Sequence, residues 1–598
     1  MSRAGADIPK ALLDVELERL AASDAFRRSP RQLHLLLYLV EQVRAGHGLR
    51  LKESVLAIEV LGRSASHFDS AHDTAVRVMV RRLRQRLARY YAGEGAWAAV
   101  EIELPVGSYQ VQFLRRLQNG GAKLPSIAVL PFLNFTGNPA LNGFCDGLSD
   151  EITDALARLP GVKVVARTSA FRFRGVVADM RTIGQALGVA TLLEGSVQIG
   201  ASGGLKVVAQ WVRAIDGYHA WSRTMAAAAG EANEVFQDHV ARAIVAGLQL
   251  RLLQGDSSNT APTPGLPASR RSSSVAAQEL YNAGRYLLRL ETIDGYRRAI
   301  DVLREATAAD ADFALAHCAL GRALVSLIGM TIAPSNGLLT GARQALLRAL
   351  AIDPELGEAH ALSGFIQCAF DHDWAQAEPA FLRGIRNAPS LPYTHAAYAW
   401  ALTMNARFAE ADNEFRFARE LDPLDIKLRT HHALVALYAG NDVQAISEFA
   451  SVLQVEPGQA IARVLLATAH LWGDDADEAE RRFEELLRMY PTLTIGEVGL
   501  AQVDALRGRS DSARERLARL TRDRRGVHLP PYQIAMIHSR LGDAAKAIFW
   551  LNKAATQRDM NFVCAPLDRT FAALRGDLRF TRLLQKHGLR PLWPTASA

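Results

Sequence analysis

The sequence predicts a multidomain, mainly α-helical protein, with a small α+β unit first, a second α+β domain in the middle and an α-solenoid at the carboxyl end. Three observations support this prediction. An arginine-rich amphipathic stretch precedes two short alternating segments, strand-like and helix-like stretches alternate between residues 126 and 253, and small residues recur at a fixed step beyond residue 275. With 598 residues the chain is too long for one core, because a domain usually holds roughly 100 to 200 residues.

The arginine-rich stretch runs from Asp73 to Tyr91 and is expected to form one helix with six arginines and a single acidic residue. At ~100° per residue, its apolar residues form one stripe that faces a small core. That stripe consists of Val76, Val80, Leu83 and Leu87. The arginines flank the opposite side, which suits a groove walled by phosphates. Taken alone, the pattern is equally typical of a solvated basic face.

The neighbouring segments favour the groove interpretation. An apolar helix is expected from Leu33 to Val43, and a shorter helix from Lys52. After the arginine-rich helix, VEIEL (Val100 to Leu104) and YQVQF (Tyr109 to Phe113) alternate in polarity around a proline and a glycine, which predicts a β-hairpin. Three helices with a basic third helix, closed by a hairpin, are the layout of a winged helix-turn-helix.

Two runs carry a resemblance to a known family. They are Val76-Arg77-Val78-Met79-Val80-Arg81-Arg82-Leu83-Arg84-Gln85-Arg86-Leu87 and Pro105-Val106-Gly107-Ser108-Tyr109-Gln110-Val111. Residues 30 to 114 resemble the OmpR-type winged-helix DNA-binding domain of bacterial transcription regulators, although Arg77 and Met79 stand where that family commonly has Asp and His. The resemblance implies binding to double-stranded DNA. We expect base contacts from Arg77, Val78, Arg81 and Gln85, phosphate contacts from Arg82, Arg84, Arg86 and Arg89, and wing contacts from Ser108 and Tyr109. The alternative is a structural or protein-binding winged helix.

The middle of the chain predicts an α+β domain. Its expected order is a buried strand SIAVLPF from Ser126, a helix from Asp146, a strand VKVVAR, a helix at Met180 to Leu187, an antiparallel pair, a short strand GYHAW and a long helix from Glu234 to Leu252. The strings SIAVLPF, FCDGLSDEI, VARTSAF, LEGSV and GYHAW occur in the order typical of the TolB amino-terminal-like or FlgO-like domain, which this segment resembles. Asp146 and Ser149 are expected to cap the helix that follows them rather than to act in catalysis. The domain is assigned a binding or coupling role.

Beyond residue 275 the chain is self-similar, with a step of 34 residues from Pro389 on and longer linkers in the first repeats. The step is kept by four prolines and by two ladders of alanines. These are Pro389, Pro423, Pro457 and Pro491; Ala399, Ala433, Ala467, Ala501 and Ala535; and Ala411, Ala445, Ala479, Ala513 and Ala547. This is the tetratricopeptide pattern, in which small residues let paired helices approach and proline follows the second helix. We expect eight helix pairs, a capping helix in the tail and a concave face that binds a protein or peptide partner.

Composition narrows the function classes. Residues 1 to 116 hold 18 Lys and Arg against 13 Asp and Glu, so most of the net charge of +7 lies there. The four cysteines are widely spaced, and the sequence contains neither a secretory signal nor a membrane-spanning run. Histidines such as His360 and His395 are spread over separate repeats. We therefore expect a cytoplasmic protein without disulfide bonds, metal, cofactor or membrane partner.

The predicted domains are a winged helix (1–116), a joint (117–125), the TolB-like domain (126–253), a flexible linker (254–275) and the repeat array with its capping helix (276–590). Together they indicate a one-component DNA-binding transcription regulator that is not an enzyme. The alternatives are a regulatory or scaffold component of adenylate-cyclase-type signalling without its own catalytic domain, and a pure scaffold. The sequence leaves open the operator, the effector, the direction of regulation and whether two copies pair.

Overall fold

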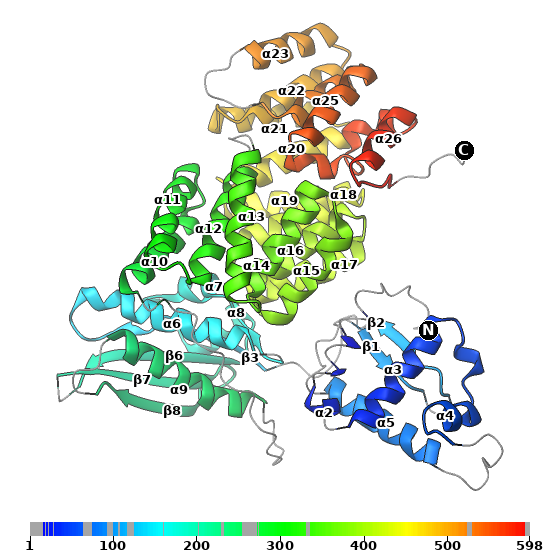
Figure 1. Cartoon of the computed structure of the whole chain (residues 1–598). Helices are drawn as coiled ribbons and strands as arrows, with labels where there is room; N and C mark the ends of the chain where they lie inside the picture. Colours follow the sequence, from blue (N-terminus) through cyan, green and yellow to red (C-terminus); the bar gives the residue numbers. More distant parts are fainter. Residues whose placement is uncertain are drawn as a thin grey trace. The chain divides into compact units, whose positions relative to one another are not determined.

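The computed structural model describes residues 13, 16–17, 20–21, 23–27, 29–63, 75–92, 100–105, 108–115, 125–159, 161–176, 178–200, 203–228, 233–253, 272, 274–330, 335–522 and 529–592. The chain forms two compact units (Figure 1). The first unit consists of Met1–Pro125 and Leu159–Lys163, and the second of Ser126–Arg158 and Val164–Ala598. Within the described ranges, no helix combines the length and the apolar composition that crossing a membrane requires.

The first unit packs short helices against a two-stranded antiparallel hairpin. Its elements are α2 (Asp24–Arg27), α3 (Pro30–Arg44), α4 (Glu53–Glu59), α5 (Ala75–Ala92), β1 (Val100–Glu103) and β2 (Gln112–Arg115). Proline at the start of α3 explains why this helix begins three residues before the predicted Leu33, since proline suits the first helical turn. In the hairpin Val100 pairs with Arg115 and Glu103 with Gln112.

The predicted second hairpin strand is shifted toward the carboxyl end. It was expected from Tyr109 to Phe113, but β2 begins at Gln112. The Ser108 hydroxyl accepts a hydrogen bond from the Gln110 amide at 3.0 Å, which turns the backbone before the strand starts. Asp73, Val106 and Gly107, on which parts of the sequence argument rested, lie outside the described residues.

The predicted apolar stripe of α5 is confirmed as the core of the first unit. Val76 and Leu83 are fully buried, and Val80 and Leu87 are nearly so. The Tyr91 hydroxyl, one turn further on, accepts a hydrogen bond from the Ile102 amide at 2.9 Å. The inner face of α5 is therefore fixed against the hairpin.

The second unit begins with a sheet in the order β5-β3-β6-β7-β8, with β4 also pairing with β6. The strands are β3 (Ser126–Val129), β4 (Leu133–Asn134), β5 (Lys163–Val164), β6 (Thr191–Ile199), β7 (Leu205–Arg213) and β8 (His219–Ala226). The accompanying helices are α6 (Asn142–Ala157), α7 (Arg167–Ala170), α8 (Met180–Leu187) and α9 (Asn233–Leu253). Strand β3 runs parallel to β6, whereas β6, β7 and β8 are successively antiparallel, as the sequence predicted for β6 and β7. Gly195 of β6 leaves room for the Phe132 ring, which a Cβ atom would meet at 2.2 Å.

The predicted caps of α6 are wrong. The helix begins at Asn142, so Asp146 and Ser149 lie inside it. The buried Ser149 hydroxyl donates to the Cys145 carbonyl at 2.9 Å and accepts from the Phe132 amide at 3.0 Å. Asp146 instead forms an ion pair with Arg174. Asparagine starts the helix four residues early, which the apolar pattern after Asp146 did not reveal.

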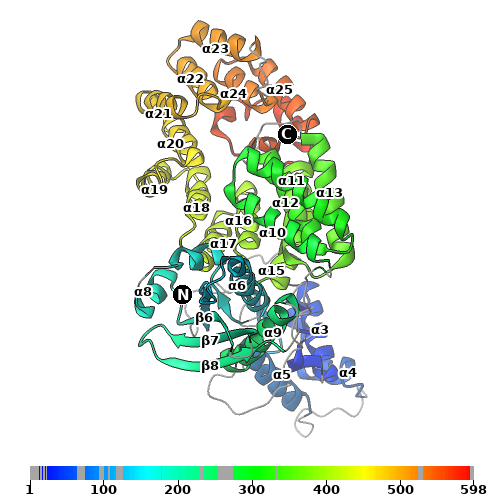
Figure 2. The same cartoon turned by 90° about the vertical axis from the view of Figure 1, so that its left-hand side faces the viewer.

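The rest of the second unit is an array of paired helices, which Figure 2 shows stacked one after another. Within the described ranges there are eight pairs: α10 (Val275–Leu290) with α11 (Ile293–Ala309), α12 (Ala314–Gly329) with α13 (Ser335–Ile352), α14 (Gly357–Ile366) with α15 (Trp374–Asn387), α16 (Pro392–Met404) with α17 (Phe408–Leu421), α18 (Ile426–Tyr438) with α19 (Asp442–Val455), α20 (Ala460–Trp472) with α21 (Ala476–Met489), α22 (Thr494–Leu506) with α23 (Ser510–Arg522), and α24 (Pro531–Arg540) with α25 (Ala544–Thr556). A final helix, α26 (Leu578–Lys586), lies in the predicted capping segment.

Packing follows the 34-residue period. In both alanine ladders every residue is fully buried except Ala433, which is 5% exposed. Each proline of the ladder stands two residues after a second helix ends, as Pro389 does after α15 and Pro423 after α17. The predicted eight helix pairs are confirmed. The alanines of the two ladders are buried where the paired helices pack.

A second ladder at the same step was not predicted. In the third to eighth pairs, the turn between the two helices holds one residue with a positive φ angle: His372, Ala406, Gly440, Asp474, Gly508 and Gly542. Only half of them are glycines, so residue type alone did not show the left-handed turn that recurs in the array.

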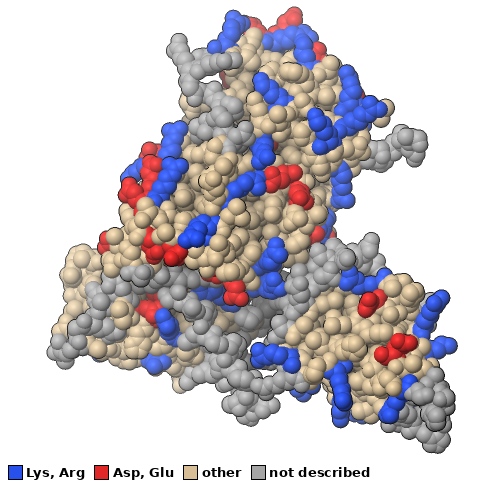
Figure 3. Space-filling view, in the orientation of Figure 1, with Lys and Arg blue, Asp and Glu red and all other residues tan. Residues whose placement is uncertain are grey.

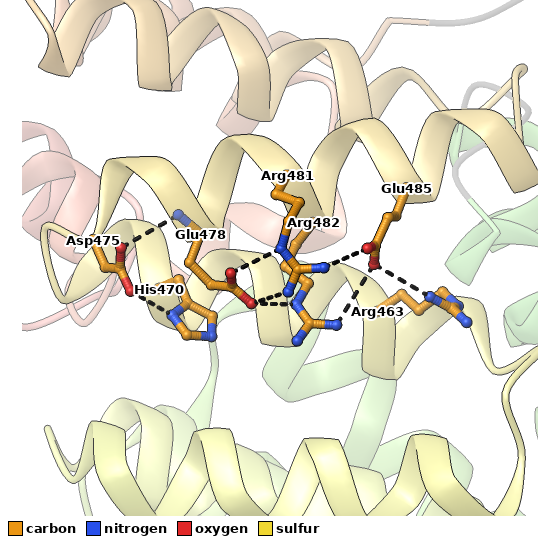
Figure 4. Close-up of polar contacts among 7 residues, drawn as sticks. All are labelled: Arg463, His470, Asp475, Glu478, Arg481, Arg482 and Glu485. Atoms are coloured by element: carbon orange, nitrogen blue, oxygen red, sulfur yellow. Dashed lines mark hydrogen bonds and ion pairs between the residues drawn. The ribbon is translucent and has the colours of Figure 1, made fainter.

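Ion pairs connect the helices of the sixth pair (Figure 4). Glu478 accepts hydrogen bonds from Arg481 Nε at 2.9 Å and from Arg482 Nε at 2.7 Å. Arg481 also donates to Glu485 at 2.6 Å, and Glu485 lies 4.0 Å from Arg463 of α20. Hydrogen bonds from Arg481 are the main reason why the pKa of Glu478 falls to about 2 from the ordinary value of 4.5.

We predict that Glu478→Gln destabilises this pair of helices by about 0.5 to 1 kcal/mol at pH 7, the upper range for a partly exposed ion pair. A carboxylate with a depressed pKa contributes stability above pH 4.5 and loses that contribution as the pH falls toward 2. The difference between variant and parent, measured by hydrogen exchange of α21 amides in the full chain, should therefore shrink from pH 7 to pH 3.5. Glu484→Gln, at an exposed position of the same helix, is the control. An equal effect of both variants, or a loss that does not change with pH, would contradict the prediction.

Candidate nucleic-acid interface

The buried stripe fixes which side of α5 faces solvent. Six of the ten predicted contact residues are exposed; Arg77 lies at the edge of that side, and five lie on it: Val78, Arg81, Arg82, Gln85 and Arg89. They lie within a sector of roughly 100° centred opposite Val76 and Leu83. Figure 3 shows basic side chains projecting around most of the outline of the first unit, with few acidic side chains between them. The exposed face of α5 therefore presents cations and one amide at helical spacing.

The Arg84 side chain donates hydrogen bonds to three backbone carbonyls of the same unit. Its Nε donates to the Leu104 carbonyl at 2.8 Å, and its Nη2 donates to the carbonyls of Pro105 and Ser108 at 2.8 and 2.9 Å. These three acceptors lie where the hairpin turns. A planar guanidinium can satisfy several carbonyls at once, so Arg84 anchors the hairpin to α5.

Two further arginines also have partners within the first unit. Arg77 Nε lies 2.9 and 3.2 Å from the carboxylate oxygens of Glu53 on α4. Arg86 donates to the Ala25 carbonyl on α2. Three of the six arginines thus join elements of the unit, although Arg77 is also exposed. The other three, Arg81, Arg82 and Arg89, are exposed on the solvent side.

Ser108 and Tyr109 lie at the base of the hairpin, and both are half-buried. Burial is the main reason why the pKa of Tyr109 is raised, and the negative charge of Glu53 adds to the effect. The positive charges of Arg77 and Arg84 act in the opposite direction. Tyr109 therefore belongs to the same polar cluster as the two arginines, and its hydroxyl stays protonated at neutral pH.

Sequence reasoning missed Glu53 and the anchoring role of Arg84. The partners of these two side chains stand 24 and 20 or more positions away in the chain. No spacing rule within a helix or a hairpin links such distant positions. Only the packing of α4 and the hairpin against α5 brings the groups together.

The repeats use their histidines for packing. His360 and His395 bind the carbonyls of Pro354 and Pro389 at 2.8 and 2.9 Å, in both cases six residues earlier in the chain. Each such contact ties the start of one helix pair to the end of the preceding pair. In the part of the chain that the structure describes, no three His, Cys, Asp or Glu side chains are grouped to hold a metal ion.

Part of the array's surface is occupied by the chain's own carboxyl-terminal segment. Thr570 accepts a hydrogen bond from Trp472 Nε1 at 3.3 Å, and Asp568 accepts one from the Tyr532 hydroxyl at 2.8 Å. Arg569 forms an ion pair with Asp442. These contacts join residues 568–570 to three different helix pairs. A partner that binds the array must therefore use surface that this segment leaves accessible.

Comparison with known proteins identifies the repeats. The family model described as tetratricopeptide repeat matches residues 436–493, which include α20 and α21. Over 132 residues the chain is 37% identical to a protein of Rhizobium meliloti (strain 1021) named "Putative adenylate cyclase 3". The match covers 22% of this chain and 22% of that protein, so the chain spans about a fifth of its relative.

Parts of the chain are also similar to solved structures. The pilF protein of Pseudomonas aeruginosa is 18% identical, with 35% of this chain and 90% of that chain covered and a TM-score of 0.28. A tetratricopeptide repeat protein from Parabacteroides merdae is 17% identical, with 40% and 93% covered and a TM-score of 0.31. The family match and the 34-residue packing period together show that the carboxyl-terminal region is built of tetratricopeptide repeats.

We predict that Arg84→Ala loosens the hairpin, because three carbonyls lose their donor. Leaving such groups unpaired costs about 1 to 3 kcal/mol in total, some of which water recovers at the half-buried site. Hydrogen exchange of residues 100–115 in the full chain should rise accordingly, and Arg84→Lys should rescue the loss only in part. Arg82→Ala, at an exposed position on the same helix, should leave exchange in the hairpin unchanged. Equal protection in the Arg84 and Arg82 variants would refute the anchoring role.

Proposed function

We propose that the first unit binds double-stranded DNA through the exposed face of α5, and that the chain is a DNA-binding regulator whose repeats dock a protein partner. The observation that supports this proposal best is the geometry of α5. One side of the helix is buried, the other presents Arg81, Arg82 and Arg89, and Arg84 holds a hairpin beside it. A helix that fills a groove, with a hairpin at its side, is the docking arrangement of winged helices.

The structure refines which residues are proposed to touch DNA. Arg81, Arg82 and Arg89 are exposed and suited to phosphates, while Val78 and Gln85 lie between them and face outward toward base edges. Arg77, Arg84 and Arg86 already bind protein groups. We therefore assign them to positioning the helix and the hairpin. Ser108 and Tyr109 retain their proposed place at the wing.

The repeats supply the second half of the proposal. Arrays of this kind bind extended peptides or helices of other proteins along their surfaces. In the proposed regulator, binding of such a partner to the repeats would be the signal, and DNA binding by the first unit would be the response. The TolB-like assignment of the middle domain likewise remains a proposal, supported by its strand order and by the motifs that it contains.

A second candidate function rests on the Rhizobium relative. Its name associates a similar stretch with adenylate cyclase, so this chain would act as a regulatory or scaffold component of such signalling. Because the match covers only 22% of each protein, it supports a shared module rather than a shared activity. Formation of cyclic AMP from ATP and manganese by the purified full chain would contradict the non-enzymatic assignment.

Salt dependence of DNA binding tests the first proposal. We expect the full chain to bind a duplex, with log affinity falling linearly as log salt concentration rises from 50 to 200 mM. Arg81→Ala, Arg82→Ala and Arg89→Ala should each reduce the slope by about one unit, because each removes one phosphate contact. Fluorescence anisotropy with a labelled duplex measures both quantities.

Arg298→Ala provides the matched control, since Arg298 is an exposed arginine on α11 in the repeats. It should leave affinity and slope unchanged. Absence of duplex binding, a flat salt response, or an equal effect of Arg298→Ala and Arg82→Ala would rule out α5 as the DNA-binding element.

A further inference from the structure

The short helix α7 of the sheet domain contacts the turn between α17 and α18 of the repeats. Thr168 and Ser169 each donate a hydroxyl hydrogen bond to the carboxylate of Asp422, the residue that follows α17. The Ala166 amide donates to the Leu421 carbonyl at 2.7 Å. Ser169 is fully buried and Asp422 is 4% exposed, so the hydrogen bond between these two residues is shielded from water.

Elsewhere in the array the aspartate of this turn caps an amide of its own turn directly. After α11, Asp310 accepts the amide hydrogen of Asp312 at 3.0 Å, and after α13, Asp353 accepts that of Glu355 at 3.0 Å. In each case the aspartate caps the amide two residues later, which is a common turn for this residue type. The equivalent amide after Asp422 is that of Leu424.

At Asp422 a side chain from the sheet domain takes over this role. The Leu424 amide donates to Ser169 Oγ at 2.9 Å, while the Ser169 hydroxyl donates to Asp422. Ser169 thus stands between the aspartate and the amide that the aspartate would otherwise cap. The Asp422 carboxylate and the Leu424 amide are therefore both hydrogen-bonded to the same hydroxyl.

Neighbouring contacts extend this interface. The Leu424 side chain packs against the sheet-domain cluster that contains Val165 and Leu187. Ser390, which follows α15, accepts a hydrogen bond from the Val164 amide at 3.2 Å. Further along, Arg285 of α10 lies 3.7 Å from Asp150 and 3.9 Å from Asp154 of α6. Three separate helix pairs therefore contact the sheet domain.

We propose that the segment Ala166–Ala170 of the chain itself occupies a binding site on the repeat array. The insertion of Ser169 into the Asp422 turn then holds the sheet domain and the repeats together as one body. The covalent connection through residues 254–271 is then not what holds the two together. The occupant of this surface is the chain's own α7, so an external partner of the repeats meets an array that already carries the sheet domain. This inference is independent of whether the first unit binds DNA.

Cleavage of the full chain between the two domains tests the proposal. A site-specific protease sequence replaces residues within 258–268, and the cut protein is analysed by size-exclusion chromatography and by analytical ultracentrifugation on dilution. The two fragments should remain together after cleavage. Asp422→Ala should weaken their association by about tenfold or more, because the buried Ser169 hydroxyl and the neighbouring Thr168 hydroxyl lose their acceptor. Ser169→Asp should weaken it at least as much, since two carboxylates would face each other.

Asp353→Ala is the matched control, because Asp353 stands at the equivalent turn, is likewise followed by proline and caps the same relative amide. It should leave the association unchanged. Far-ultraviolet circular dichroism checks folding, and if Asp422→Ala unfolds the repeats, Ser169→Asp in the sheet domain decides the question. Separation of the parent fragments, or association of the Asp422 and Ser169 variants as tight as that of the Asp353 variant, would overturn the proposal.

The interface should also respond to pH. Burial raises the pKa of Asp422 to about 6, opposed by the hydroxyls of Ser169 and Thr168 and assisted by the charge of Asp425. Burial likewise raises the pKa of Asp150 to about 6, opposed by Arg285, Arg167 and Arg289 and assisted by Asp154. Carboxylates that bind protons more tightly when docked favour docking at low pH, and this preference is lost as the pH rises from about 4 through 6.

The cut fragments should therefore associate more tightly at pH 5 than at pH 7.5, and Asp422→Asn should reduce the difference. A pH-independent association in the parent protein would contradict this part of the proposal.

Discussion

Close packing of paired helices at buried small residues is the constraint on which most of this structure depends. Ala399, Ala467 and Ala501 are fully buried at equivalent positions, and Phe415 and Phe483 fill the space between the helices. At Gly499 a Cβ atom would meet the Phe483 ring at 2.4 Å, so even alanine would force a shift there. Because every pair repeats this geometry, the turns between pairs recur at regular places along the array.

These regular turns differ in the side chains that form hydrogen bonds with their aspartates. The turn aspartate Asp353 caps a backbone amide of its own turn, whereas Asp422 receives Thr168 and Ser169 from the sheet domain. Asp310 likewise accepts a hydrogen bond from Ser272, which precedes the first helix of the array. Serine hydroxyls suit this role, since each can donate to a carboxylate and accept from an amide at the same time. A repetitive scaffold can thus hold non-repetitive segments at defined positions.

In the first unit, the arginines of one helix have two different roles. Its long helix carries six of them, and the fold separates those that join its elements, such as Arg84 at the hairpin, from those that are exposed, such as Arg82. An exposed basic face binds phosphates by charge, whereas the orientation of the helix in a groove depends on the hairpin and on α4. Arginines that hold those elements therefore influence function without contacting the ligand. The proposed DNA-binding surface and its supporting contacts belong to one helix for this reason.

The sequence by itself determined everything that follows from local periodicity. The 34-residue step predicted the helix pairs and their buried alanines, and the spacing of Val76, Val80, Leu83 and Leu87 predicted the inner face of α5. It failed where a helix start or a strand start depends on a single turn, as at Asn142 and Gln112. Only the tertiary structure decided that Arg84 holds the hairpin and that Ser169 meets Asp422, 253 positions away. Periodic burial is encoded residue by residue along the chain, whereas a contact between distant polar groups exists only after the elements that carry them have packed together.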